Sequence, residues 1–163
     1  MTTPPTRMVI TGGVLIGALC AIWTYVMGFT GWHKHPTLLF AFFLVIPIEI
    51  GVLFWGLRKT SGENGYWRQV SLGTAMAVIG GVLLFLNSLL FTNVVFPEYL
   101  SELRAAYGEI LKGQGKTEAE IAVELARQAE SQTPLRNAFD GFVGTAATGF
   151  LASLAIAAFA RKR

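Results

Sequence analysis

The chain has 163 residues, of which 53% are hydrophobic and only 14% charged, with a formal net charge of +3. Soluble domains average about one quarter charged residues, so this composition indicates an integral membrane protein. The basic residues lie at the ends of apolar runs, which is typical of membrane proteins and argues against nucleic-acid binding. The single cysteine, Cys20, excludes an intrachain disulfide.

Four apolar runs are each long enough to cross a bilayer, which takes about 20 residues. The predicted spans cover residues 8–29, 37–57, 70–96 and 134–160. The first follows one positive charge, as in a signal peptide, but it runs past twenty residues without a convincing cleavage site. We therefore expect a retained helix there, and a kink at Pro47 in the second span. The predicted fold class is all-α, a single domain built as a bundle of four transmembrane helices.

Residues 97–133 form the one sizeable polar segment, and their pattern predicts an amphipathic helical hairpin. Glycines at 113 and 115 separate the two arms, and Thr117 with Glu120 has the spacing of a capping box. Thr133 followed by Pro134 is typical of a helix start. The apolar faces of the hairpin are expected to dock a partner through Leu100, Leu103, Tyr107, Leu111, Ile121 and Leu125.

The positive charges predict an orientation. Basic residues near position 7, in the loop between the second and third spans, and at the C-terminus all fall on one side of a four-span protein. The opposite side has Lys34 and the hairpin, in which acids outnumber bases. The positive-inside rule then predicts cytoplasmic N- and C-termini, with residues 97–133 outside, in the periplasm of a Gram-negative cell.

Small residues recur at every fourth position in three of the spans and predict the surfaces where helices approach closely. The positions are Gly13 and Gly17; Gly73, Ala77 and Gly81; and Gly141 and Gly149. We expect these rows to form the core of the single chain, and the alternative is the seam of a homodimer.

Glu49 is the one acid well inside a span, where a charge costs several kcal/mol unless it is paired or lies in a polar cavity. It is either a proton or cation site, or a neutral acid hydrogen-bonded to a neighbouring helix, for which Ser153 is a candidate acceptor. Asn87, Thr24 and Thr145 fall near one depth and are expected to form a polar layer whose role is structural.

His33 and His35 flank Lys34 in the first outer loop and are the only candidates for a metal site. Metal sites generally need three or four ligands, and Lys34 repels cations, so an ordinary interfacial loop is the preferred interpretation. We find no nucleophile elbow, phosphate loop or zinc-helix motif, and predict no catalytic residue and no cofactor.

Three segments carry a resemblance that covers nearly the whole chain: Phe96–Tyr99, Gly115–Ile121, and Thr133–Leu135 leading into a glycine-rich last helix. Their layout, with a basic loop after the second span, resembles a family of bacterial four-span inner-membrane proteins described only as a domain of unknown function. The resemblance implies the topology and a bacterial inner-membrane location, and it implies no activity or site residue.

Together these patterns favour a non-enzymatic structural protein or accessory subunit that binds the bilayer and a membrane-protein partner. The alternative is a small transporter or channel that acts as a homo-oligomer and uses Glu49. An enzyme acting on lipid ranks last, because Glu49, His33 and His35 lie at different depths.

Overall fold

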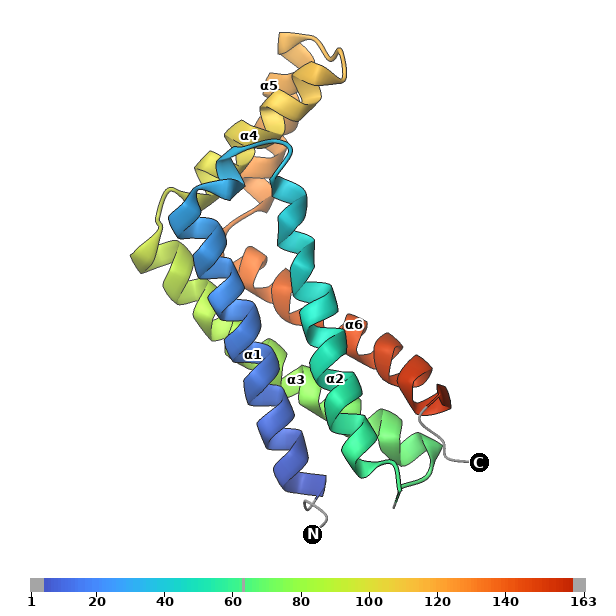
Figure 1. Ribbon diagram of the computed structural model, residues 1–163. Helices are drawn as coiled ribbons and strands as arrows, with labels where there is room; N and C mark the ends of the chain where they lie inside the picture. Colours follow the sequence, from blue (N-terminus) through green and yellow to red (C-terminus); the bar gives the residue numbers. More distant parts are fainter. Residues whose placement is uncertain (1–4, 63, 160–163) are drawn as a thin grey trace.

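A computed structural model describes residues 5–62 and 64–159, and within these ranges the chain is helical and has no strand (Figure 1). Four helical segments are long and apolar enough to cross a membrane, as the sequence predicted. They are α1 (Pro5–Thr30), η2 (Leu39–Leu44) continued by α2 (Val45–Thr60), α3 (Tyr66–Leu90) continued by η3 (Phe91–Val95), and α6 (Pro134–Phe159). Short η1 (Trp32–Lys34) follows α1, and α4 (Tyr99–Gly113) and α5 (Glu118–Ser131) separate α3 from α6.

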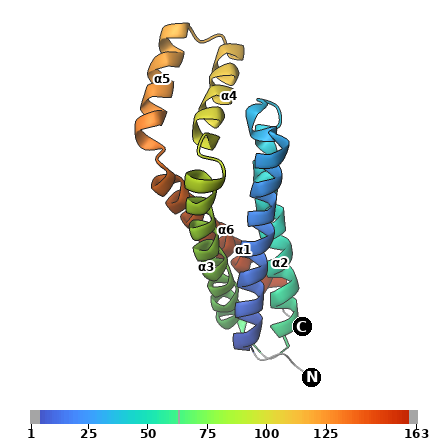
Figure 2. The same ribbon diagram turned by 90° about the vertical axis from the view of Figure 1, so that its left-hand side faces the viewer.

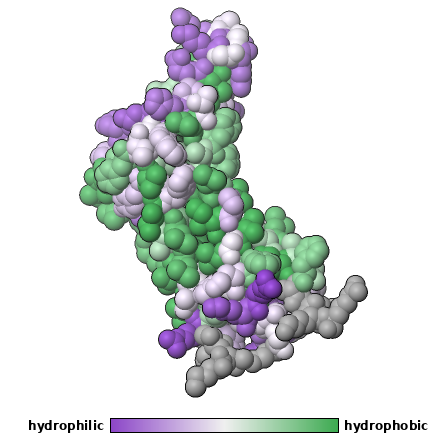
Figure 3. Space-filling model, in the orientation of Figure 1, coloured by the Kyte–Doolittle hydropathy of each residue, from purple (hydrophilic) through white to green (hydrophobic). Residues whose placement is uncertain are grey.

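The apolar surface forms a broad middle band, with hydrophilic residues on the α4–α5 end and on the opposite end (Figure 3). This distribution fits four spans embedded in lipid, because only side chains beyond the hydrocarbon layer can be hydrated. The third span begins at Tyr66 rather than Val70, because the extended backbone at Gly65 ends the preceding loop. Residue 160, the predicted end of the last span, lies outside the described residues.

The second span changes helix type shortly before Pro47. Its first six residues form the 3-10 helix η2, and Pro47 falls in the first turn of α2. Proline is tolerated there because first-turn N–H groups have no partner within their own helix. On α1, Trp23 donates to the Ala41 carbonyl at 2.9 Å and the Cys20 thiol to the Val45 carbonyl at 3.7 Å. The junction is therefore fastened to the first span.

Helix α3 packs along both α1 and α6, and small residues line both contacts (Figure 2). A Cβ added at Gly13 would lie 2.6 Å from Ile79 Cβ, and one at Gly17 would lie 2.7 Å from Leu83 Cβ. On the other side, Gly73 lies against Ser153, Gly149 against Ala77, and Gly81 against Phe142. These small residues therefore contact neighbouring helices of the same chain. A larger side chain at any of them would force the helices apart.

Gly141 differs from the other predicted packing residues. It is exposed, and a Cβ added there would meet nothing within 4 Å. The first half of α6 thus does not use this glycine to approach a neighbour.

Two helices, α4 and α5, occupy the predicted hairpin segment and extend beyond the four spans (Figure 1), and their location outside the cytoplasm stays a prediction. Gly115 has φ of 80° and turns the chain between the two arms. The capping box at Thr117 and Glu120 is confirmed, and Thr133 accepts from the Arg136 N–H at 3.2 Å as predicted for the start of α6.

The structure corrects part of the docking prediction. Leu100 and Leu111 are buried within the chain, and Leu100 packs with Phe91 and Tyr99. Because both side chains are buried inside the chain, they are not available to bind a partner. Leu103, Tyr107, Ile121 and Leu125 are half-buried, and Leu125 lies against Gly108 between the two arms. Docking through these four residues stays a prediction.

A buried histidine fastens α4 to the loop after α1. His33 is only 1% exposed, and its Nδ1 binds the Met27 carbonyl at 3.0 Å while its Nε2 lies 2.8 Å from Glu102 Oε2. Lys34 Nζ donates to Glu102 Oε1 at 2.7 Å. The hydrogen bonds from Lys34 and His33 hold the pKa of Glu102 below its ordinary value of 4.5.

We expect Gly80→Ala to lower the free energy of unfolding by about 1–3 kcal/mol, since overpacking a tight contact displaces its neighbours. The added Cβ would lie 2.6 Å from Ile16 Cγ2 on α1. Thermal unfolding of the detergent-solubilised protein measures the effect. Gly51→Ala is the matched control, because a Cβ there meets nothing within 4 Å. Equal stability of the two variants would refute the close approach of α1 and α3.

We expect Glu102→Gln to lower the melting temperature at pH 7, by an amount corresponding to roughly 1 kcal/mol or less for a partly exposed ion pair. Because the folded-state pKa of Glu102 is depressed, its contribution is present above the unfolded pKa and is lost as pH falls through the lowered value. The difference between wild type and variant should therefore shrink below pH 4.5. Melting curves at pH 7 and at lower pH test this, with exposed Glu109→Gln as the control. A difference that stays constant across this range contradicts the pairing.

Candidate functional site: a cavity among the spans

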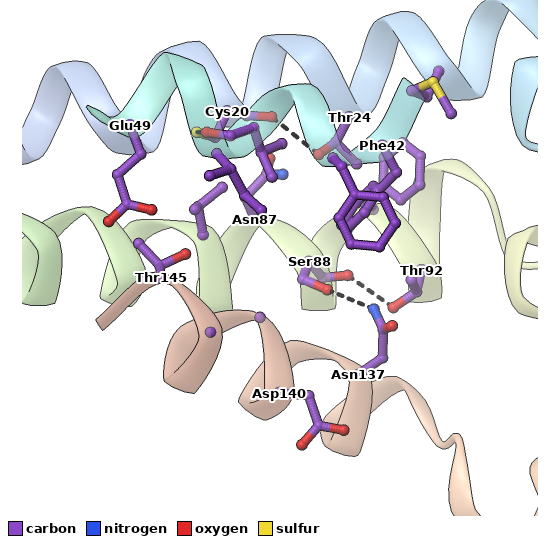
Figure 4. Close-up of a pocket in the computed structure, with 18 of the residues that line it drawn as sticks. Cys20, Thr24, Phe42, Glu49, Asn87, Ser88, Thr92, Asn137, Asp140 and Thr145 are labelled. Atoms are coloured by element: carbon purple, nitrogen blue, oxygen red, sulfur yellow. Dashed lines mark hydrogen bonds between the residues drawn. The ribbon is translucent and has the colours of Figure 1, made fainter. Parts of the chain in front are cut away.

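A cavity of about 460 Å³ lies among the four spans, toward the end that bears α4 and α5 (Figure 4). Its wall is mainly apolar and aromatic, with polar side chains contributed by every span. The polar lining residues are Cys20, Thr24, Glu49, Asn87, Ser88, Thr92, Tyr99, Asn137, Asp140, Thr145 and Thr148. A mainly apolar surface with polar groups among it is characteristic of ligand-binding cavities.

Glu49 lies at one end of the cavity and points from α2 toward α6 (Figure 4). Its side chain is only 4% exposed, and Oε1 is buried without a hydrogen-bond partner. A Cβ added at Gly149 would lie 2.7 Å from this oxygen, so the glycine provides the space that the carboxyl group occupies. The predicted intramembrane acid is thus buried at Oε1, and the residue also lines the cavity.

Thr24, Asn87 and Thr145 line the same cavity from three different helices, as Figure 4 shows. The hydroxyl of Thr24 donates to the Cys20 carbonyl in its own helix at 3.0 Å. The sequence placed these three residues near one depth, and the structure adds that they share a cavity with Glu49. All three residues line an open space. The structural role predicted for this polar layer stays a prediction.

Ser153 was the proposed partner of Glu49, and the structure places it elsewhere. Its hydroxyl donates to the Gly149 carbonyl at 2.6 Å, one turn earlier in α6, and it packs against Gly73. Ser153 therefore belongs to the contact between α3 and α6 and does not line the cavity.

The opposite end of the cavity carries polar groups that the sequence interpretation did not assign to a site. Asn137 on α6 donates to Ser88 on α3 at 3.2 Å, and Thr92 donates to the Ser88 carbonyl at 2.8 Å. Tyr99 also lines this end, and burial raises the pKa of its hydroxyl to about 12, so it stays neutral. A usable signal was present: residues 137, 141, 144, 145 and 148 follow the three-four spacing of one helix face.

The cavity opens between η2 and the first half of α6. Gly141 and Gly144 line it from α6, and a Cβ added at either would meet nothing within 4 Å. Opposite them, the lining residues Phe42 and Phe43 are 43% and 58% exposed. Both of these segments belong to apolar helices that are long enough to cross a membrane.

The two histidines lie outside this cavity. His33 is engaged by Met27 and Glu102, whereas His35 is exposed in the loop. Across residues 5–62 and 64–159, no group of three or more His, Cys, Asp or Glu side chains is arranged to hold a metal ion.

Asp140 lines the cavity near its opening, and its carboxylate pairs at 2.9 Å with Arg136, four residues earlier in α6. Among the described lining residues, Glu49 and Asp140 are the carboxylic acids, and none is a lysine, arginine or histidine. The paired acid at the opening and the unpaired acid at the far end therefore give the cavity a net acidic lining.

No curated protein and no solved structure matches the chain. One family model, described as a protein of unknown function, matches residues 11–162 and so covers nearly all of it. The chain therefore belongs to the DUF4199 family, and its four apolar helices are long enough to cross a membrane.

Proposed function

We propose that this protein is a non-enzymatic integral membrane protein that binds a small lipophilic molecule in the cavity among its spans. The observation that supports this function is the cavity of about 460 Å³, whose surface is mainly apolar and which every span also lines with polar side chains. Its volume lies within the range of about 300–1,000 Å³ found for small-molecule sites. Its opening between two apolar spans would admit a molecule dissolved in the bilayer.

We place the protein in the inner membrane of a bacterium, with cytoplasmic termini and with α4 and α5 outside the cell or in the periplasm. The support is the distribution of charge: Arg58 and Lys59 end α2, and Arg68 lies in the first turn of α3 at the same end of the bundle. Positive charges of this kind accumulate on the cytoplasmic side.

A second candidate function is that of an accessory subunit that binds a membrane-protein partner through the hairpin. Helix α5 contains no buried residue, and Val123 on it is 72% exposed. An apolar side chain so exposed outside the membrane band is available to a partner.

Transport by a homo-oligomer is the remaining alternative, with Glu49 as the coupling acid. The small-residue rows that such an oligomer would use are largely occupied between α1, α3 and α6 of one chain. The first candidate requires no second copy and is therefore preferred.

To test ligand binding, we would fill the opening with Gly144→Leu and measure saturable binding of tritiated naphthalen-1-ylmethanol and naphthalen-1-ylmethylamine to purified protein by scintillation proximity. Binding of at least one probe should be lost or fall severalfold, because the new side chain enters space that the ligand occupies. The melting temperature should change little, since nothing lies within 4 Å of the added Cβ.

Gly51→Leu is the matched control, because Gly51 also has open space around it but does not line the cavity. It should bind both probes as the wild type does. If neither probe binds the wild type saturably, or if Gly144→Leu binds them unchanged, the proposed function is wrong.

Orientation and hairpin docking can be tested together by labelling single cysteines with a membrane-impermeant maleimide. Val123→Cys should react in intact cells, whereas Gly62→Cys, in the exposed loop between α2 and α3, should react only after permeabilisation. The native Cys20 is buried and supplies the background. If a partner covers α5, Val123→Cys in cells at native expression should react more slowly than in the purified protein.

The reverse pattern of accessibility would place the hairpin in the cytoplasm and contradict the proposed orientation. Equal labelling rates in cells and in the purified protein would mean that no partner covers Val123.

A further inference from the structure

We propose that the ligand of the cavity is a lipophilic amine whose ammonium group pairs with Glu49 and whose hydrocarbon part lies against the phenylalanines near the opening. This inference rests on the proposed function and names the ligand class for it. It is supported by the unpartnered buried carboxyl, the charges of the lining and the position of the opening.

The first step is the state of Glu49. Glu49 is only 4% exposed, and its Oε1 atom has no hydrogen-bond partner. Buried polar groups are almost always paired, and an unpaired one within a span is especially costly. Because Glu49 also lines the cavity, a donor or cation bound there would pair with its carboxyl group.

The second step is the sign of the lining. The described lining residues include two acids, Glu49 and Asp140, and no lysine, arginine or histidine. Asp140 is paired with Arg136 at 2.9 Å, so its charge is largely offset. Glu49 is the acid of this described lining without an ion-pair partner, and a base on the ligand would supply one.

The third step is the hydrophobic part of the ligand. The cavity is lined by the aromatic residues Phe42, Phe43, Phe91 and Tyr99, by Met27, and by the aliphatic residues Leu39, Val45, Ile46, Leu84 and Leu103. Apolar and aromatic surface favours a hydrocarbon body, and a cation near a ring face gains further attraction. A hard metal ion such as Ca²⁺ takes six to eight oxygen ligands, for which this wall is poorly suited.

The geometry also suggests how the molecule would lie. Figure 4 shows Glu49 and Thr145 at one end of the cavity, with Phe42 toward the other and Asn87 between them. An amine would enter between η2 and α6, pass Gly141 and Gly144, and place its charged group beside Glu49. Asn87 and Thr145 would then accept or donate hydrogen bonds near the ammonium group.

The test compares the two tritiated probes introduced above, which share one ring system and differ in charge. At pH 7 naphthalen-1-ylmethylamine is a cation and naphthalen-1-ylmethanol is neutral. Wild-type protein should bind the amine at least roughly tenfold more tightly than the alcohol, because only the amine satisfies a buried carboxyl group with a charge-assisted bond.

Glu49→Gln should weaken amine binding by roughly tenfold or more while changing alcohol binding little, since glutamine keeps the shape and removes the charge. Retained alcohol binding shows that the variant is folded and that the cavity is intact. Glu109→Gln, which removes an exposed acid on α4 away from the cavity, is the matched control and should bind both probes normally.

Equal affinity of the wild type for the two probes would overturn the inference and leave the proposed function standing, because a binding cavity would still exist. An unchanged preference for the amine in Glu49→Gln would also overturn it. A loss of amine binding in Asp140→Asn as large as that in Glu49→Gln would overturn the assignment of the charge to Glu49. Failure of both probes to bind would refute the proposed function itself.

Discussion

The close approach of α3 to α1 on one side and α6 on the other is the contact on which the remaining architecture depends. In a bilayer the hydrophobic effect does not drive helices together, so close packing of small residues has to do so. Gly13, Gly17 and Gly80 bring α1 and α3 together, and Gly73 and Gly149 do the same for α3 and α6. With α3 held between two neighbours, the position of α2 follows from its contacts with α1 and with the second half of α6.

The same packing explains why a cavity exists at all. Gly149 and Ser153 hold the second half of α6 against α3, and Glu49 of α2 reaches Gly149 there. In the first half of α6, the glycines at 141 and 144 have open space in front of them, and η2 lies opposite. Gly149 thus lies in close contact with neighbouring helices, whereas Gly141 and Gly144, on the same helix, face open space.

The sequence predicted the features that depend on local pattern. It did not predict which residues are buried where that depends on how two helices pack. Length and hydropathy predict the four spans, and cap residues predict the start of α5 and of α6, because these signals act within a few residues. Gly141 and Gly149 share one helix face and look equivalent in the sequence. Only the crossing of α6 over α3 determines that Gly149 is buried and Gly141 is exposed.

Ser153 and His33 show the same limit for polar residues. Depth counted along a helix placed Ser153 near Glu49, but depth does not give rotation about the helix axis, and Ser153 faces Gly73 instead. His33 was considered with His35 because they are neighbours in sequence, whereas its actual partner, Glu102, is 69 residues away. The amphipathic faces of the hairpin were predicted, but whether they meet each other or a partner depends on how the arms turn. In the structure, Leu125 meets Gly108.

Glu49 joins the stability of the bundle to its proposed function. Gly149 has no side chain, and the space this leaves admits both Ala77 of α3 and the carboxyl group of Glu49. A larger residue at position 149 would separate α3 from α6 and displace the acid at the same time. If packing alone determined this contact, an apolar side chain at position 49 would fill the space without the cost of burying a carboxyl group. An unpaired acid at the junction of three helices, facing a cavity lined by no base, is better explained by a ligand that supplies the missing donor.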